Sequence, residues 1–371
     1  MIGKQELLER LLEYTEEEEV YREYYALRDD PEGRERFLRE RETFAREHRL
    51  LIFEYPFVSY PEVLTEADLY PFLSISREGS VNVVRHLRYT PVFWHSHSFF
   101  TVLYVLRGRC GHRVGDLDLP MERGDVFFLP PYVRQTIEVF DDSLVLNIHI
   151  RRDTFDDVFF SSLRYNNILS DFFLGCLYSR EHGGNGILFK TGEDEEIEES
   201  FLEMVRETER DDAYSWKLLN HLVPLLFVRL LRGYSDTAVF PGENRRQGRS
   251  GTLPILSYIR DNYRDITLEK TAEHFHYSVS HCSRLIREET GTGFVDFVRR
   301  IRMGHAASML TESRQPVADI STMVGYENPE SFIRAFEKVY GMSPTQYRRM
   351  EGEKKAESDL QDMAGFSHPL A

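Results

Sequence analysis

Arg284 and Arg334 have equivalent places in two segments of similar pattern near the C-terminus of the sequence. A guanidinium group is planar and can donate two parallel hydrogen bonds, so it suits a partner that offers two acceptors side by side. A second cation follows each arginine, Arg287 in the first segment and Lys338 in the second. The paired donors match the O6 and N7 acceptors of guanine, and the second cation suits a phosphate.

Each arginine lies in the second helix of a predicted helix-turn-helix unit. Thr267 and Ser278 precede apolar-periodic segments and are typical helix N-caps. In the second unit, Gly325 is placed to end one helix, and Asn328 and Pro329 to begin the next. The pattern therefore predicts the same supersecondary unit twice.

A connecting helix is predicted between the two units. Apolar residues recur at helical spacing from Phe294 to Leu310, over about five turns. Two helices held in a fixed relation can enter successive major grooves, roughly 34 Å apart. Glu330 can accept a hydrogen bond from cytosine, and Ile333 can contact a thymine methyl group. The candidate contacts to bases or phosphates are Ser280, His281, Ser283, Arg284, Arg287, Glu330, Ile333, Arg334 and Lys338.

The C-terminal segment resembles a known signature. Residues 320–348 read ISTMVGYENPESFIRAFEKVYGMSPTQYR, which is similar to the signature of the AraC/XylS family of bacterial transcription regulators. Arg302, Ala306 and Leu310 match the linker helix of that family. Glu337 stands where the family usually has a lysine, so no phosphate contact is expected there. The resemblance implies a sequence-specific DNA-binding regulator with two helix-turn-helix units.

The distribution of charge limits how this chain can bind DNA. The 371 residues have a formal net charge of −16, which argues against a surface that binds nucleic acid all over. From Thr252 to Met350, however, 13 lysines and arginines face 12 acidic residues. The acidic excess therefore lies outside the predicted DNA-binding domain, and we expect modest, salt-sensitive binding.

Cysteine usage and hydropathy bear on the compartment. The three cysteines are far apart and odd in number, which is typical of a reducing cytoplasm. The N-terminal residues lack the apolar segment of a signal peptide. Residues 222–231 are apolar, but Pro224 and Arg229 interrupt them and they are too short to span a bilayer. We expect a cytoplasmic protein with no membrane partner.

Residues 80–150 have the pattern of a β domain. Short segments of aromatic and β-branched residues alternate with turns, which predicts a sandwich or barrel. His95-Ser-His97, residues 104–108 and residues 124–131 resemble the paired motifs of a cupin, a sensor that AraC-type regulators often carry. The resemblance puts the other metal-ligand positions at Thr101 and Gln135. Two imidazoles remain where a stable site needs three or four ligands, so we expect no metal and no cofactor.

A small-molecule site in this barrel is the functional interpretation of the same residues. The candidates are His95, His97, Tyr104, Gln135 and His149. Alternatively, the histidines lie at the barrel mouth and are satisfied by backbone groups or water. Asn147 is two residues from His149 and faces the same way on a strand, either into that pocket or toward solvent.

The predicted fold class is α+β multidomain, with a cupin-like β-barrel, flanking helices and an all-α double helix-turn-helix domain. Residues 1–50 read as helices with an acidic run at Glu16–Glu19, which we interpret as a solvated arm or as a partner surface. The expected ranges are a helical arm 1–50, a barrel sensor 51–152, a helical dimerisation region 153–234, a linker 235–253, the double helix-turn-helix domain 254–350 and a disordered tail 351–371.

The leading functional hypothesis is a transcription regulator under the control of an unknown small-molecule effector. We expect double-stranded DNA as a partner, a homodimer, and RNA polymerase if the protein is an activator; repression is equally compatible with the sequence. We expect no enzymatic activity. The alternatives are a metal-dependent cupin enzyme with an appended helical domain, and a regulator whose barrel binds no ligand and only dimerises.

Overall fold

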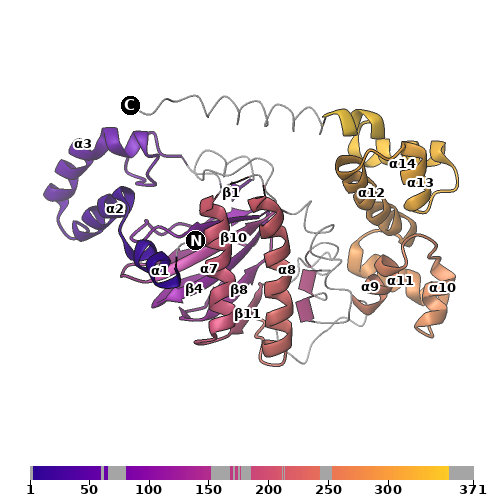
Figure 1. The fold of residues 1–371 in the computed structure, drawn as a ribbon, viewed down its shortest axis with the longest axis horizontal. Helices are drawn as coiled ribbons and strands as arrows, with labels where there is room; N and C mark the ends of the chain where they lie inside the picture. Colours follow the sequence, from indigo (N-terminus) through magenta and orange to yellow (C-terminus); the bar gives the residue numbers. More distant parts are fainter. Residues whose placement is uncertain are drawn as a thin grey trace. The chain divides into compact units, whose positions relative to one another are not determined.

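The computed structural model in Figure 1 describes residues 3–59, 62–65, 81–151, 168–169, 172–173, 176, 185–210, 212, 214–242 and 253–350. The chain divides into two compact units. The first, which we call the sensor unit, contains residues 1–152 and 184–243, and the second contains residues 153–183 and 244–371. The N-terminal arm, the β domain and the helices that follow it therefore belong to one unit.

Two antiparallel sheets form the sensor unit, and apolar side chains fill the space between them. The larger sheet has the order β11-β8-β4-β10-β2, and the smaller has β6-β5-β7 with β9 also paired to β5. Leu103 and Phe127 of the larger sheet meet Val114 and Ile137 of the smaller in one buried cluster. The strands are β2 (Val81–Arg85), β4 (Phe100–Arg107), β5 (Arg109–Val114), β6 (Leu117–Asp118), β7 (Met121–Glu122), β8 (Asp125–Leu129), β9 (Gln135–Glu138), β10 (Leu144–Ile150) and β11 (Ile187–Lys190), beside a short parallel pair of β1 (Val63–Leu64) and β3 (Ser96–His97).

Two helices lie across the outer face of the larger sheet (Figure 1). These are α7 (Glu195–Arg210) and α8 (Ser215–Tyr234). The ring of Tyr104 on β4 stacks on Phe201 of α7, with 4.0 Å between the ring centroids, and Phe128 of β8 meets Phe227 of α8 edge to face. The three central strands β4, β8 and β10 are therefore buried on both faces, which explains their nearly continuous apolar sequences.

Three helices precede the sheets: α1 (Lys4–Leu12), α2 (Glu16–Ala26) and α3 (Pro31–Glu47). Thr15 forms a reciprocal capping box with Glu18 at the start of α2. Leu7 and Leu11 of α1 are buried. This arm packs within the sensor unit, and its acidic run is only partly solvated, because Glu18 is completely buried.

The second unit is helical: six of its helices have bounds, and residues 344–350 form part of a further one. The six are α9 (Leu253–Asp261), α10 (Leu268–His274), α11 (Val279–Thr290), α12 (Phe294–Glu312), α13 (Val317–Met323) and α14 (Pro329–Tyr340). The predicted caps are confirmed, since the side chains of Thr267, Ser278 and Asn328 each accept a backbone N–H of the following helix. The connecting helix is α12, with 19 residues. Figure 1 shows α12 between the two helix pairs.

The fold class predicted from the sequence is confirmed, but one boundary differs. Val239 lies in the predicted linker, yet it exchanges two backbone hydrogen bonds with Leu188 of β11 and so belongs to the sensor unit. The remainder of that linker from residue 243 to 252 and the predicted disordered tail lie outside the described residues. So does most of the segment 153–184, the first part of the predicted dimerisation region.

Candidate nucleic-acid interface and ligand site

The first recognition helix, α11, turns its apolar side to the core and its polar side to solvent. Cys282 and Ile286 are buried, whereas Ser280, Arg284 and Arg287 are exposed and His281 and Ser283 half-buried. The guanidinium of Arg284 is already engaged within the helix. Its Nη2 lies 3.0 Å from Nδ1 of His281, and its Nη1 lies 3.5 Å from a carboxylate oxygen of Glu288.

The second recognition helix, α14, has the same orientation. Phe332 and Phe336 are buried, and Glu330, Arg334 and Lys338 are exposed. Arg334 forms a long hydrogen bond, 3.4 Å from Nη2 to the hydroxyl of Ser331. Ile333 is half-buried against the core of this half, so less of its side chain is available for a thymine methyl group than an exposed position would offer.

The second unit has two halves, the helix-turn-helix pair α10–α11 and the pair α13–α14. Arg302 of α12 fixes these halves to each other. Its Nε and Nη2 donate to the carbonyl oxygens of Tyr263 and Arg264, both at 2.8 Å, and its guanidinium lies over the ring of Tyr326. Gly325 has φ +87°, and a Cβ there would lie 2.2 Å from the Arg264 carbonyl oxygen. Only glycine allows this approach. The two recognition helices are therefore held in one arrangement.

The end of the family-like segment also has a structural role. Arg348 donates from Nε to the Leu310 carbonyl at 3.2 Å and from Nη2 to the Gln315 carbonyl at 2.6 Å. The neighbouring Tyr347 packs its ring against Phe336. These bonds satisfy carbonyl groups at the end of α12, so Arg348 stabilises the domain and is not a candidate for DNA contact.

In the sensor unit, strand register brings several polar side chains to one face of the larger sheet. His149 of β10 lies directly opposite Thr101 of β4 and Asn82 of β2, and Asn147 lies opposite Leu103, a residue of the cluster between the sheets. Side chains directly opposite each other share a face. His149, Asn147, Asn82 and Thr101 therefore all point into the space between the two sheets.

Hydrogen bonds and ring contacts join the predicted histidines to this group. His97 Nδ1 lies 2.8 Å from the hydroxyl of Thr101, and its ring centroid lies 5.6 Å from that of His149 and 5.1 Å from that of His95. The amide of Gln135 lies between two imidazoles, 2.9 Å from His112 Nε2 and 3.3 Å from His95 Nε2. We call these eight residues the interior polar cluster: Asn82, His95, His97, Thr101, His112, Gln135, Asn147 and His149.

Tyr104 is not part of this cluster. It alternates with Leu103 along β4, so it points to the opposite face of the sheet, where its ring stacks on Phe201. The sequence motifs predicted Tyr104 as a member of this site and gave no indication of Asn82 or His112. The alternation of Cys110, His112 and Val114 along β5 is the signal that predicts an inward His112.

Four buried atoms of the interior polar cluster have no hydrogen-bond partner among the described residues. They are Asn82 Nδ2, His112 Nδ1, Asn147 Oδ1 and His149 Nδ1. An unmet buried polar group costs roughly 1–3 kcal/mol, so native proteins usually supply such groups with a partner. The set includes both a donor and an acceptor, which a bound molecule with hydroxyl or amide groups satisfies.

The interior polar cluster is uncharged near neutral pH. Burial lowers the pKa of His149 to about 3 and that of His112 to about 4, and it also lowers the pKa of His95 and, strongly, of His97. The remaining members are amides and a threonine. In the part of the chain that the structure describes, no group of three or more His, Cys, Asp or Glu side chains is arranged to hold a metal ion.

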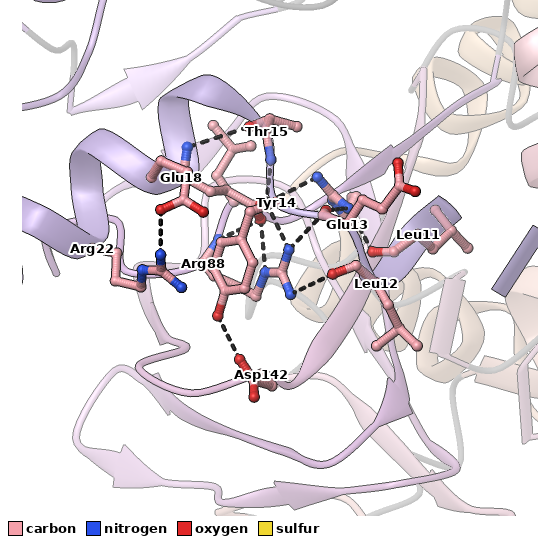
Figure 2. A network of polar contacts seen from close by, with 12 residues as sticks. Leu11, Leu12, Glu13, Tyr14, Thr15, Glu18, Arg22, Arg88 and Asp142 are labelled. Atoms are coloured by element: carbon pink, nitrogen blue, oxygen red, sulfur yellow. Dashed lines mark hydrogen bonds and ion pairs between the residues drawn. The ribbon is translucent and has the colours of Figure 1, made fainter. Parts of the chain in front are cut away.

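A second buried polar group, which the sequence analysis missed, fixes the N-terminal arm to the barrel (Figure 2). Glu18 of α2 accepts hydrogen bonds from the backbone N, Nε and Nη2 of Arg88 at 3.0, 3.0 and 2.8 Å, and from Arg85 Nη2 at 3.0 Å. Burial alone would raise the pKa of Glu18, but the bonds from Arg88 and the charge of Arg85 lower it below its usual value. Glu18 is therefore a buried carboxylate that stays ionised.

The same arginines also bind the backbone between α1 and α2. Arg88 donates to the carbonyl oxygens of Leu12 and Glu13, and its guanidinium lies 3.7 Å above the ring of Tyr14. The hydroxyl of Tyr14 in turn donates to Asp142 at 2.5 Å (Figure 2). A charge placed this way has nearly all its partners supplied by protein, which is the condition under which a buried ion pair is tolerated.

Comparisons with known proteins agree with this architecture. A family model described as an AraC-like ligand-binding domain matches residues 84–212, and a helix-turn-helix domain model matches residues 271–350. No described helix is long and apolar enough to cross a membrane.

Three similar proteins indicate how far the resemblance extends. The uncharacterized HTH-type transcriptional regulator YfiF of Bacillus subtilis (strain 168) is 23% identical over 268 residues, which cover 70% of this chain and 80% of YfiF. The multiple antibiotic resistance protein MarA of Escherichia coli (strain K12) is 31% identical over 119 residues, 31% of this chain and 86% of MarA. The C-terminal domain of AraT, a response regulator from Geobacillus stearothermophilus, is 37% identical over 26% of this chain and 85% of its own, with a TM-score of 0.25.

The matches fall on the two regions described above, the barrel with its interior polar cluster and the pair of helix-turn-helix units. The chain belongs to the AraC family of helix-turn-helix transcription regulators, and it carries an AraC-like ligand-binding domain ahead of its DNA-binding domain.

Proposed function

We propose that this regulator reads two successive major-groove segments of its operator with α11 and α14, as a homodimer whose sensor unit responds to an uncharged small molecule. The observation that carries the proposal is the pair Arg284 and Arg334, exposed at equivalent positions of two recognition helices that Arg302 holds in one arrangement. Helices held in this way suit grooves one helical turn apart.

Each exposed side chain has an expected role at the interface. Arg284 and Arg334 donate pairs of hydrogen bonds to guanine, and Glu330 accepts from cytosine. Arg287 and Lys338 contact phosphates, because they lie one turn further along each helix. Ser280, Ser283 and His281 complete the first half, with a smaller contribution from the half-buried Ile333 in the second.

The interior polar cluster is the proposed effector site. Its four unmatched atoms favour a ligand with both donors and acceptors, and its neutral histidines favour an uncharged molecule over a carboxylate or phosphate. An effector shifts the equilibrium between two arrangements only by its differential affinity for them. YfiF, which matches 70% of this chain, is named as an HTH-type transcriptional regulator, and this supports a sensor role for the barrel in preference to the alternative of a cupin enzyme.

Effector binding can be tested by thermal shift with a panel of uncharged metabolites and matched carboxylates. A ligand at about 100 times its dissociation constant stabilises the protein by about 2.7 kcal/mol. We expect an uncharged compound to give this shift, and Asn147→Leu to abolish it while the protein stays folded. A shift that survives both Asn147→Leu and His149→Phe would place the effector elsewhere.

A stripe on α8 is the proposed dimer contact. Tyr214, Leu218, Leu225 and Val228 are exposed on one face, at intervals of four, seven and three residues, with His221 in the intervening position. That spacing is the heptad pattern of paired helices. Sedimentation at micromolar concentration should give a dimer, and Leu218→Glu with Leu225→Glu a monomer. A monomeric wild type would contradict the dimer.

The test of DNA reading is selection from randomised duplexes at low salt, followed by footprinting at low and higher salt. We expect a site with two specific segments about one helical turn apart for each protomer. If the protein is an activator, RNA polymerase is the further partner at such a site. No selected motif, or protection that disappears evenly with salt, would show that the helix-turn-helix pair does not read bases.

A further inference from the structure

A basic groove lies in the second unit between the connecting helix α12 and the recognition helix α14. Its volume is about 490 Å³, and Arg299 and Val295 of α12 line it together with Arg334 and Lys338 of α14. None of the described lining residues is acidic. The groove is therefore a concave surface of one charge sign next to a predicted base-reading arginine.

We infer that this groove binds the DNA backbone between the two recognised segments, with Arg299 as a phosphate contact that the recognition helices themselves do not provide. The inference rests on the proposed function, because the groove opens on the face of α14 that carries Arg334 and Lys338. The chemistry is charge complementarity between clustered cations and consecutive phosphates.

The cations of the groove are not equally available. Arg302 also lines it, but both of its bonding nitrogens donate to carbonyls of the first half, so it is structural. Among the described residues, no carboxylate forms an ion pair with Lys338. Arg299 and Lys338 therefore remain for phosphates when Arg334 contacts a base.

Arg299 has a competing partner one turn earlier on its own helix. Its Nη1 forms an ion pair with Asp296, whose side chain is 57% exposed whereas that of Arg299 is 24% exposed. A DNA phosphate that binds Arg299 must displace this carboxylate. Because an exposed ion pair contributes little free energy in water, breaking this one costs little. Asp296 therefore competes only moderately with a DNA phosphate for Arg299.

The experiment measures the affinity of the full chain for its selected duplex across a range of salt concentrations. Arg299→Gln should lower affinity at low salt and reduce the slope of log K against log salt by about 0.9, the contribution of one phosphate. Equivalently, a fourfold rise in salt should weaken the variant about 3.5-fold less than the wild type. Arg299→Lys should keep the wild-type slope because it retains the charge.

The matched control is Arg300→Gln. Arg300 is exposed and follows Arg299 on α12, and its substitution by glutamine removes the same charge. It is not among the described residues that line the groove. We expect the control to keep the wild-type slope. If Arg299→Gln and Arg300→Gln change the slope equally, the effect is long-range charge and the inference is wrong.

A second measurement uses the unmodified protein and so does not depend on how a variant folds. Ethylation of the phosphates midway between the two protected segments should interfere with wild-type binding. If ethylation of these phosphates does not interfere with binding, the inference is wrong. If decanoate binds in a way that depends on Arg299 while Arg299→Gln leaves DNA binding unchanged, the groove is instead a site for a free amphipathic anion. Failure of the proposed function looks different, because the wild type would then select no sequence at all.

Discussion

Arg88 in the sensor unit and Arg334 in the second unit are the same residue type in opposite environments. Arg88 is 1% exposed and donates hydrogen bonds to Glu18 and to two backbone carbonyl groups. Its guanidinium also lies over the ring of Tyr14. Arg334 is exposed and has one long bond to Ser331. The first has its hydrogen-bonding capacity used by the protein, and the second retains it for a partner.

The difference separates structural charges from recognition charges. A buried charge that loses its partner destabilises the fold, whereas an exposed charge contributes little to folding and is free to contribute to binding. The sensor unit places its charged network and its neutral histidines inside. The second unit keeps the arginines and lysines of its recognition helices on the surface. Substitutions in the two regions should therefore affect different measurements.

The largest expected effect is at Glu18. Glu18→Gln leaves Arg85 and Arg88 without their carboxylate inside the sensor unit, and such a loss typically costs about 3–5 kcal/mol of unfolding free energy. Urea denaturation of the sensor unit measures it. Glu17→Gln is the control, because Glu17 pairs with His48 at a partly exposed position and should cost less than about 1 kcal/mol. Equal losses in the two variants would show that the buried carboxylate of Glu18 is no more important for stability than a partly exposed one.

Arg334→Ala should act on DNA binding with little change in stability. We expect a loss of roughly 1–3 kcal/mol in binding free energy, confined to sites that keep the guanine it contacts. Fluorescence anisotropy with the selected duplex measures the affinity, and thermal unfolding should give the wild-type midpoint. A large drop in that midpoint would mean that Arg334 is structural like Arg88.

The neutral histidines make the stability of the sensor unit depend on pH. Burial lowers the pKa of His149 to about 3 and of His112 to about 4, below the value of about 6.5 expected in the unfolded chain. Below pH 6.5 the unfolded chain therefore binds protons that the folded chain does not, and stability falls as the pH drops.

Each such histidine should contribute a slope of about 1.4 kcal/mol per pH unit between pH 6.5 and its folded pKa. Denaturation of wild type and His149→Phe at pH 5, 6 and 7 tests this. The variant should lose the slope of one histidine. Identical slopes in the two proteins would mean that His149 is already protonated or solvated in the folded chain.

Within the second unit, Arg284 and Arg334 differ in the charge that lies one helical turn further on. The charges that follow the two arginines are in opposite order, Arg287 then Glu288 in α11 and Glu337 then Lys338 in α14. Arg284 therefore has a carboxylate one turn further along its helix, whereas Arg334 has a lysine at the equivalent position. Glu288→Gln frees Arg284, and we expect binding to tighten by about 0.3–0.5 kcal/mol. Glu289→Gln removes the same charge beside it, and an equal gain there would indicate a general charge effect.

The parts of the fold that depend on local sequence could be predicted. The caps Thr267, Ser278 and Asn328 and the connecting helix follow from side chains within a few residues, and the structure confirms them. The exposed positions of Arg284 and Arg334 follow from helical periodicity in the same way.

Features that depend on strand register or distant packing could not be predicted. Glu16 to Glu19 look alike in the sequence, and only the docking of α2 beside β2 decides that Glu18 meets Arg85 and Arg88. Tyr104 lies in a cupin-like motif, but pairing register turns it away from the polar interior. A shift of one residue moves a strand side chain to the other face, so a motif alone does not fix its orientation.

The most direct test of the account is a base-substitution scan of the selected site, with wild type and Arg334→Ala titrated against every single-base variant. We expect Arg334→Ala to lose its preference at one base pair of the second segment and to keep the preferences elsewhere. Uniform weakening across all sequences would contradict it, because Arg334 would then contact only phosphate.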